Sequence, residues 1–525
     1  MAMFRQKHGR EPTTREVHGI TTRTRDRKLA EITTAEVRQR QRADFPAERA
    51  VALDALIDAA RQRGPLSTAE AGEAAALTQA RNHLYERASV QQGHEVLAEA
   101  LNQNLGRLSL DALQQTLVEG QAIDFVPLKS DQSGLHASYA TREGLQQELS
   151  VIAIVNDGRN ACAPLGRRGF RPSESLSEDQ RNAVQSLLAS TDRVCALRGV
   201  AGAGKTFTLQ EVSRGLAESG REIFACAPTT SAAAVLRQDG LTNATTLSDF
   251  LQNAVSTHGP RLMGAVFIVD EAGIASARQG AALCALAEQQ SARVILVGDS
   301  RQHSGVEAGD FLAILENHSR LRTAELTDIR RQTAREYRSA VKLMAQGQAR
   351  AGVERLDQMG WIEESGADYV KRAAERYVEC AVTKRDTILV APTWEEIHRL
   401  TDAVRAGLKN RGLLGEGHPV TVAEPLAWTK AQAETVANYR PGFLLTLHQP
   451  LRDARMAAGA TVEVVGVARS HIRVRDPQGR EVDVAPRRQS AAWTTATPRT
   501  IELAPGDRVL VRQNHRTAAL INGEV

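Results

Sequence analysis

An eight-residue glycine-rich segment constrains the fold of this chain most strongly. Residues 199–206, GVAGAGKT, satisfy the pattern G-x-x-x-x-G-K-[ST]. An apolar run at 194–197 precedes the segment, and an amphipathic stretch with Leu209, Val212 and Leu216 follows it. Strand, glycine loop and helix in this order bind phosphate, because glycines let successive N–H groups point inward and the helix N-terminus adds unpaired donors. The sequence therefore predicts a nucleoside-triphosphate site, and its glycine order disfavours the dinucleotide fingerprint G-x-G-x-x-G.

The residues expected to bind ATP lie in or before this loop. Lys205 is expected to reach the β- and γ-phosphates, and the Thr206 hydroxyl to ligate Mg²⁺. The expected phosphate-binding set is Gly199, Gly202, Ala203, Gly204, Lys205 and Thr206. Upstream of the loop, Gln180 carries a carboxamide with the donor and acceptor needed to pair with adenine. Gln180 can equally be a surface glutamine on a helix, and its spacing leaves both interpretations open.

Strands alternate with helices from residue 193 to about 331, which predicts a mostly parallel sheet. Two apolar runs, 265–269 and 293–297, each end in polar residues. Ligands of open α/β sheets bind at the carboxyl ends of strands, so these polar residues should surround the glycine loop. Asp270 is expected to hold Mg²⁺ directly or through water, and Glu271 to polarise the attacking water. The pattern thus predicts an α/β P-loop domain that hydrolyses ATP.

The composition restricts the class of protein further. Its 525 residues are 42% hydrophobic and 24% charged, which is ordinary for several globular domains. Because long apolar runs and the apolar core of a secretory signal are missing from the sequence, we expect a cytoplasmic protein without membrane insertion. The five cysteines form no C-x-x-C pair, which disfavours zinc sites and disulfide frameworks. A net charge of +4 with 4% aromatic residues permits nucleic-acid binding, mainly through the phosphate backbone.

Changes of pattern along the chain predict its domain organisation. Residues 76–165 contain two amphipathic helices and a two-stranded ribbon, an order typical of a winged-helix-like module. A strand-like run at 386–390, followed by a helix capped at Thr393, predicts a second α/β domain. The expected parts are a basic helical arm or linker at 1–75, the winged-helix-like module at 76–165, the P-loop domain at 176–345, the start of the second domain at 346–412, a β-rich insertion at 413–515 and a return to the second domain at 516–525.

Taken together, these motifs resemble those of superfamily 1B DNA helicases of the RecD-like group. The matching segments are LSEDQ (176–180), the GVAGAGKT loop, APTTSAAA (227–234), ATTLSDFL (244–251), IVDEAG (268–273), GDSRQHSGVEAGDFL (298–312) and LTDIRRQ (326–332). The run RQHSGVEAG is especially similar to the helicase portion of conjugative relaxase–helicases of the TraI/TrwC (MobF) type. The resemblance covers nearly the whole chain and is most specific between residues 176 and 332.

The resemblance implies RecA-like P-loop NTPase domains with parallel sheets, and an SH3-like fold for the β-rich insertion. It implies that Gln180 contacts adenine, that Gln302 senses the γ-phosphate and that Arg331 is an arginine finger. The residues that would line single-stranded DNA are Thr229, Thr230, Thr246 and His303. The implied activity is ATP-dependent 5′ to 3′ movement along DNA during conjugative transfer. Other relaxosome or type IV secretion components are the implied further partners.

Two features depart from the relaxase–helicase pattern. The 13 histidines include no H-x-H or H-H pair, so the metal-binding triad of a relaxase and its nicking activity are not expected. The family also continues past the NGE stretch near residue 525, so we expect a motor whose second domain is incomplete. The alternatives are a remnant that grips single-stranded DNA without turnover and a RecD-like repair helicase. A P-loop kinase is disfavoured, because Glu271 beside Asp270 indicates a water nucleophile.

Overall fold

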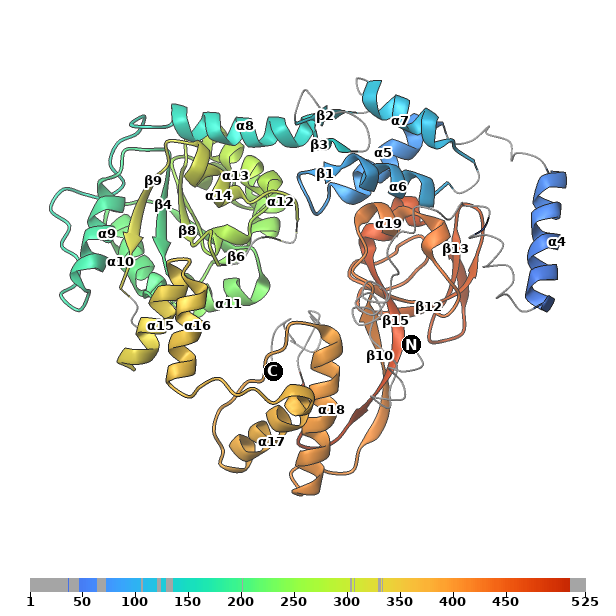
Figure 1. The fold of residues 1–525 in the computed structure, drawn as a ribbon. Coiled ribbons are helices and arrows are strands. Elements are labelled where there is room, and N and C mark those ends of the chain that lie inside the picture. The colour runs from blue at the N-terminus through green and yellow to red at the C-terminus, as the bar shows by residue number, and fades with distance from the viewer. Residues whose placement is uncertain are drawn as a thin grey trace. The chain divides into compact units, whose positions relative to one another are not determined.

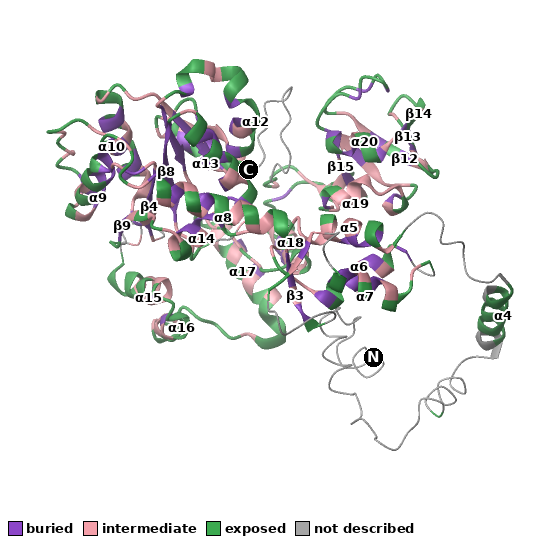
Figure 2. Cartoon of the chain, turned by 90° about the horizontal axis from the view of Figure 1, so that it is seen from above, coloured by how far each residue is buried: buried purple, intermediate pink, exposed green. Residues whose placement is uncertain are grey.

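The computed structural model describes residues 36, 47–63 and 72–509, apart from 105–106, 120–123, 129–135, 201, 303–304, 306, 329–331 and 333. The chain forms two compact units, Met1–Glu70 and Ala71–Val525. In the first unit the structure describes helix α4 (Ala47–Arg63), which is largely exposed along its length (Figure 2). Most of the predicted arm at 1–75 and all of the predicted return at 516–525 lie outside the described residues.

The N-terminal module, residues 72–141, combines three helices with a small antiparallel sheet of strand order β1-β3-β2. The predicted helices, with Val96 and Leu113 buried on their inner faces, and the predicted ribbon are confirmed, whereas the first helix and the two-residue strand β1 were not predicted. Its elements are α5 (Glu73–Leu84), β1 (Gln91–Gln92), α6 (Gly93–Asn102), α7 (Leu110–Glu119), β2 (Phe125–Pro127) and β3 (Ser138–Thr141).

Helix α8 (Arg142–Asp157) follows the module directly. The predicted N-cap is confirmed, since the Thr141 hydroxyl accepts a hydrogen bond from the Gly144 N–H at 3.0 Å. The apolar face of α8 contributes Val151 and Val155 to the core of the following domain, where α8 packs against two later helices (Figure 1). Helix α8 therefore belongs by packing to the nucleotide domain.

The nucleotide domain, residues 142–326, is built on a six-stranded parallel sheet of order β6-β5-β7-β8-β4-β9 (Figure 1). Successive side chains of the four central strands, β5, β7, β8 and β4, enter two separate apolar cores, one on each face, which is why these strands are continuous apolar runs in the sequence. The strands are β4 (Val194–Gly199), β5 (Ile223–Ala227), β6 (Thr245–Thr246), β7 (Val266–Val269), β8 (Arg293–Gly298) and β9 (Arg322–Leu326).

Helices cover both faces of this sheet. One core takes side chains from α8, α12, α13 and α14, and the other takes them from α9, α10 and α11. Besides α8, the helices are α9 (Glu178–Ala189), α10 (Lys205–Glu218), α11 (Thr230–Gln238), α12 (Leu247–His258), η2 (Gly259–Leu262), η3 (Ala272–Ile274), α13 (Ala277–Gln289) and α14 (Phe311–His318). The predicted α/β P-loop architecture is confirmed.

A buried arginine at the start of β8 forms hydrogen bonds with the segments that precede β4. Arg293, 2% exposed, starts β8 and donates to three backbone carbonyls. Its Nε donates to Asp192 at 2.5 Å, and its two terminal nitrogens donate to Ala163 at 2.7 Å and Ser190 at 3.0 Å. Burial lowers the pKa of this guanidinium, but the carbonyls keep each of its nitrogens hydrogen-bonded.

Between the nucleotide domain and the β-rich domain, the described residues form four α-helices and one short 3₁₀ helix, and the predicted strand at 386–390 is wrong. The backbone there is irregular, with Ile388 84% and Val390 78% exposed. A strand needs a neighbour to pair its backbone groups, and the described strands all pair elsewhere. The predicted cap at Thr393 is confirmed. The helices are α15 (Arg335–Ala345), α16 (Ala349–Gln358), α17 (Tyr369–Val382) and α18 (Trp394–Asn410), with a short η4 (Gly366–Asp368).

The β-rich domain, residues 413–509, forms an antiparallel sheet of order β10-β15-β11-β12-β13-β14. Its alternating residues, such as Val462 and Val464, bury one face in a common core, as the alternating pattern predicts. Its strands are β10 (His418–Pro425), β11 (Leu444–Leu447), β12 (Thr461–Val467), β13 (Ile472–Arg475), β14 (Glu481–Val484) and β15 (Trp493–Leu503). Its helices are α19 (Lys430–Glu434), η5 (Val436–Asn438), α20 (Pro486–Gln489) and η6 (Ser490–Ala492).

Replacing the buried arginine tests how much it stabilises the sheet. We expect Arg293→Met to destabilise the nucleotide domain by about 3 kcal/mol, because three backbone carbonyls lose their donors. Thermal unfolding followed by circular dichroism should show a fall of roughly 6–12 °C in the transition of this domain. The control is Arg350→Met, whose side chain is exposed and pairs only with a neighbour on its own helix. Equal melting of the two variants would contradict the structural role of Arg293.

Candidate nucleotide and DNA site

The glycine loop connects the end of β4 at Gly199 to the start of α10 at Lys205. Gly202 and Gly204 both have φ of 81°, in the left-handed region that favours glycine. A Cβ atom on Gly204 would also lie only 2.7 Å from the side-chain nitrogen of Gln180. Both the backbone conformation and the close approach therefore require glycine at position 204, and the loop has the shape expected of a phosphate cradle.

The side chain of Lys205 folds back to the start of this loop. Its Nζ donates to the carbonyl oxygen of Gly199 at 2.7 Å. The positive charge of Lys205 is also among the influences that lower the pKa of Asp270, so the two residues lie within electrostatic reach of each other. The structure thus brings the lysine of the loop and the carboxylate of a different strand to the same edge of the sheet, as the sequence predicts.

Asp270 and Glu271 follow β7 at that edge. The Asp270 N–H donates to the Cys226 carbonyl at 2.9 Å, which extends the sheet by one residue, and an oxygen of Asp270 accepts from the Glu271 N–H at 2.9 Å. Burial raises the pKa of Asp270, while the Glu271 N–H and Lys205 oppose this effect. Glu271 is exposed and adopts φ of 52°, a conformation uncommon outside glycine that turns the chain into η3.

Gln180 is not a surface glutamine, since it is 2% exposed. It is the third residue of α9 and forms a capping box, in which its Oε1 accepts from the Ser177 N–H at 3.1 Å and its own N–H donates to the Ser177 hydroxyl. Its Nε2 faces the Gly204 carbonyl at 3.5 Å. The S-x-x-Q spacing at 177–180 is the sequence signal of this box. The contact with adenine stays a prediction.

The loop after β8 carries the expected γ-phosphate sensor. Gln302 is exposed and donates to the Asp299 carboxylate at 2.8 Å. Next to Asp299, the Ser300 hydroxyl donates to Glu316 at 2.5 Å, and Glu316 pairs at 3.6 Å with Arg198, the residue that precedes the glycine loop. One carboxylate thus connects the entry of the glycine loop with the loop after β8. Two further predicted residues, His303 and Arg331, lie outside the described residues.

The threonines expected to contact DNA lie at the amino ends of helices. Thr229 caps α11 by accepting from the Ala232 N–H at 3.2 Å, and Thr246 caps α12 by accepting from the Asp249 N–H at 3.2 Å. Thr230 begins α11. This capping role was not predicted, although a threonine before an amphipathic segment is an N-cap signal. Contact of these threonines with DNA stays a prediction.

A magnesium site fits the groups at this edge. Among the described residues no three His, Cys, Asp or Glu side chains gather in a metal-binding cluster, and no helix is both long and apolar enough to cross a membrane. Mg²⁺ at a nucleotide needs few protein ligands, because phosphate oxygens and water complete its coordination. Thr206, in the first turn of α10, and Asp270, at the end of β7, offer the hydroxyl and carboxylate oxygens that such an ion prefers.

Residues 175–367 match the family described as an AAA domain. The conjugal transfer protein TraA of Rhizobium radiobacter is 27% identical over 317 residues, which are 58% of this chain and 28% of TraA. The multifunctional conjugation protein TraI of Escherichia coli K12 is 29% identical over 210 residues, 38% of this chain and 12% of TraI. The chain therefore spans less than a third of the length of these relatives.

Solved structures of Pif1 helicases are also similar to this chain. The structure of two coordinating Pif1 helicases at forked double-stranded DNA is 16% identical, covers 61% of this chain and 79% of its own, and has a TM-score of 0.34. Bacteroides Pif1 in complex with ADP-AlF4 is 17% identical, covers 60% and 75%, and has a TM-score of 0.32.

The burial of Asp270 should make it a source of instability in the protein without nucleotide. Because its pKa is raised in the folded state, stability is lost as the pH rises through that pKa and is regained below the ordinary carboxyl range. We therefore expect Asp270→Asn to melt at a higher temperature than wild type at pH 7, with the difference vanishing near pH 3–4. Melting curves across this pH range without Mg²⁺ or nucleotide would measure it. A lower melting temperature for Asp270→Asn at pH 7 would contradict the assignment.

Proposed function

We propose, from the match of residues 175–367 to the AAA domain family and the distant similarity of the chain to TraA and TraI, that this chain is the motor portion of a conjugative-transfer protein. It hydrolyses ATP to move 5′ to 3′ along single-stranded DNA. Other relaxosome or type IV secretion components are its further partners. A RecD-like repair helicase and a DNA-binding remnant without turnover are the competing functions.

One observation carries the proposal: Lys205, Asp270 and Glu271 meet at the carboxyl edge of the parallel sheet, beside a glycine loop with two left-handed glycines. When ATP binds, the Lys205 ammonium leaves the Gly199 carbonyl and neutralises the β- and γ-phosphates. Thr206 and Asp270 would hold Mg²⁺, which would offset further phosphate charge. Glu271, exposed and held by its own backbone turn, accepts a proton from the attacking water.

The roles proposed for the remaining residues of the site rest on the resemblance of their motifs to those of RecD-like helicases. Gln302, on the loop that follows β8, responds to the γ-phosphate, and Arg331 supplies a second positive charge in the transition state. Gln180, already bonded to the loop carbonyl of Gly204, orients the adenine. The groups facing DNA are Thr229, Thr230, Thr246 and His303, and they contact its backbone rather than its bases.

Two substitutions at the edge of the sheet test the hydrolytic assignment. Lys205→Ala should abolish ATP hydrolysis, because the γ-phosphate loses its positioned ammonium. Glu271→Gln should bind ATP as wild type does but reduce turnover by about 100-fold or more, because the general base is lost. The measurements are ATPase rates with and without single-stranded DNA, and nucleotide binding by fluorescence. The control is Lys371→Ala, which removes an exposed lysine on α17.

The outcomes of this assay also separate the competing functions. Stimulation of wild-type hydrolysis by single-stranded DNA supports the motor, whereas DNA binding without hydrolysis supports the remnant. Wild-type turnover in Lys205→Ala would refute the nucleotide site, and loss of ATP binding in Glu271→Gln would make Glu271 a structural or metal-binding group instead of the base.

Binding of single-stranded DNA should depend strongly on salt and weakly on base sequence. Contact with about four phosphates predicts an affinity roughly 50-fold lower at ~200 mM than at ~50 mM salt. Fluorescence anisotropy with labelled oligo-dT and oligo-dC of equal length would measure both dependences. A strong preference for one base sequence at fixed salt would contradict backbone recognition and point to a sequence reader in the N-terminal module.

A further inference from the structure

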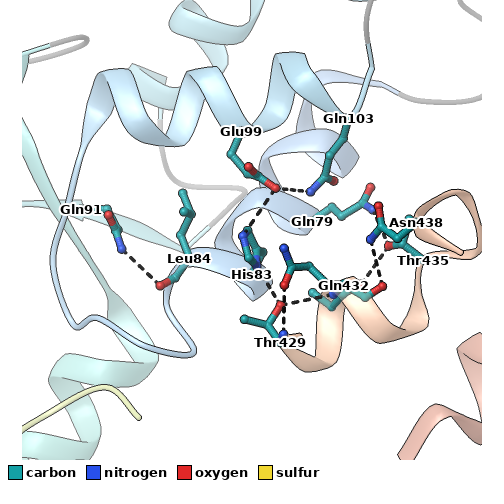
Figure 3. A network of polar contacts seen from close by, with 11 residues as sticks. Gln79, His83, Leu84, Gln91, Glu99, Gln103, Thr429, Gln432, Thr435 and Asn438 are labelled. Carbon is teal, nitrogen blue, oxygen red and sulfur yellow. Dashed lines mark hydrogen bonds and ion pairs between the residues drawn. The ribbon is translucent and has the colours of Figure 1, made fainter. Parts of the chain in front are cut away.

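The N-terminal module contacts the β-rich domain through helices α5 and α19 (Figure 3). The Gln79 amide donates to the Thr435 hydroxyl at 3.1 Å, and the His83 ring nitrogen Nδ1 lies 2.7 Å from the Thr429 hydroxyl. Thr429 is the N-cap of α19 and is almost fully buried. Residues more than 300 positions apart in sequence therefore share one polar network.

Two residues just beyond α5 extend this contact. The Glu86 carboxylate accepts a hydrogen bond from the Lys430 N–H at 2.7 Å, at the start of α19. The Arg87 guanidinium donates to the Ala427 carbonyl. Ala427 has φ of 50°, which costs energy for a residue with a Cβ atom, so the segment that enters α19 is held in an uncommon conformation where Arg87 binds it.

The backbone of Glu86 contacts the nucleotide domain at the same time. Its carbonyl accepts a hydrogen bond from the Ala308 N–H at 3.0 Å. Ala308 lies in the loop between β8 and α14, and its own carbonyl accepts from the Ala277 N–H at 3.3 Å. Beside it, Arg278 and Glu307 form an ion pair at 3.6 Å. A single residue of the N-terminal module thus bonds to two different domains.

A series of contacts between neighbouring residues connects Ala308 to the nucleotide site. Ala277 begins α13, directly after the turn that Glu271 starts, and the Ile274 N–H donates to the Glu271 carbonyl at 2.9 Å. The loop packs closely on that turn, because a Cβ atom on Gly305 would lie 2.5 Å from the Ile274 carbonyl oxygen. These contacts form a continuous route by which a movement of Glu271 would reach Ala308, the residue bonded to Glu86.

Both sides of the contact are firmly anchored. Tyr85, next to Glu86, donates its hydroxyl to the Tyr139 carbonyl at 2.8 Å and packs its ring on Phe125 inside the N-terminal module. On the other side, the Tyr439 hydroxyl donates to the Ala433 carbonyl of α19 at 2.6 Å, and its ring packs on Trp428. Rigid anchors on both sides let a displacement pass between domains instead of being absorbed.

We propose that Glu86 and Arg87 are positioning residues that couple the nucleotide site to the β-rich domain. Neither residue is among those assigned above to nucleotide or DNA. They hold the loop at Ala308 and the start of α19 in one arrangement, so a change at Glu271 on nucleotide binding shifts α19. The next step rests on the proposed function: through the same link, nucleotide and single-stranded DNA alter each other's affinity, because such coupling is reciprocal.

The first test measures α19 directly and needs no DNA. Trp428 lies two residues before α19, so its fluorescence should change when ADP with aluminium fluoride binds. The contribution of Trp428 is obtained as the part of the tryptophan fluorescence that is missing in Trp428→Phe. We expect Glu86→Ala and Arg87→Met to lose most of this change, whereas Glu119→Ala, at an exposed glutamate ending α7, keeps it. Arg87→Met leaves the Glu86 contacts in place, so it tests the link independently if Glu86→Ala folds poorly.

The second test measures the coupling itself. The ratio of nucleotide Kd without and with oligo-dT should be about 5-fold or more in wild type. It should approach one in Glu86→Ala and Arg87→Met, while their nucleotide Kd without DNA and their melting curves stay unchanged, which a merely structural role would not produce. The proposal would be overturned if both variants showed the same fluorescence change and the same Kd ratio as the wild-type protein.

A different result would overturn the proposed DNA motor instead. In that case the Kd ratio of the wild-type protein is one, while its fluorescence change is present and is lost in both variants, so the link to α19 stays supported.

Discussion

The nucleotide site depends on how closely the backbone at Gly204 approaches helix α9. The amide of Gln180 reaches the Gly204 carbonyl and at the same time closes the capping box with Ser177. Any side chain at position 204 would collide with that amide and would also suffer from the left-handed backbone. The start of α9, the curvature of the glycine loop and the start of α10 are therefore fixed together by one buried carboxamide.

Much of the nucleotide domain is predictable because its signals are local. Apolar runs that alternate with helical segments around a glycine loop predict parallel strands, and the polar residue after such a run marks the functional edge, as at Asp270. Caps are equally local: Thr141 and Thr393 each accept a hydrogen bond from an amide three residues further on. In these cases the information needed lies within one turn or one strand of sequence.

Features that depend on distant partners escaped prediction. The run at 386–390 has the composition of a strand, but composition does not supply the neighbouring backbone that a strand requires, and its side chains are exposed. Thr229 and Thr246 were interpreted through a family resemblance, which hid their capping hydrogen bonds. The contact between Glu86 and Lys430 joins residues 344 positions apart, and neither residue stands out in its own segment.

Helix α8 changes what counts as a separable part of this chain. The glycine- and proline-rich stretch near residues 163–175 is the compositional boundary, yet Val151 and Val155 lie upstream of it and fill the core of the nucleotide domain. If evolution exchanged the N-terminal module at that stretch, the nucleotide domain would lose the α8 side chains that pack in its core. An exchange at Thr141, where β3 ends and α8 is capped, would leave both cores complete. We therefore expect recombination between relatives of this chain to be tolerated best at that capped junction, where sequence composition gives no sign of a boundary.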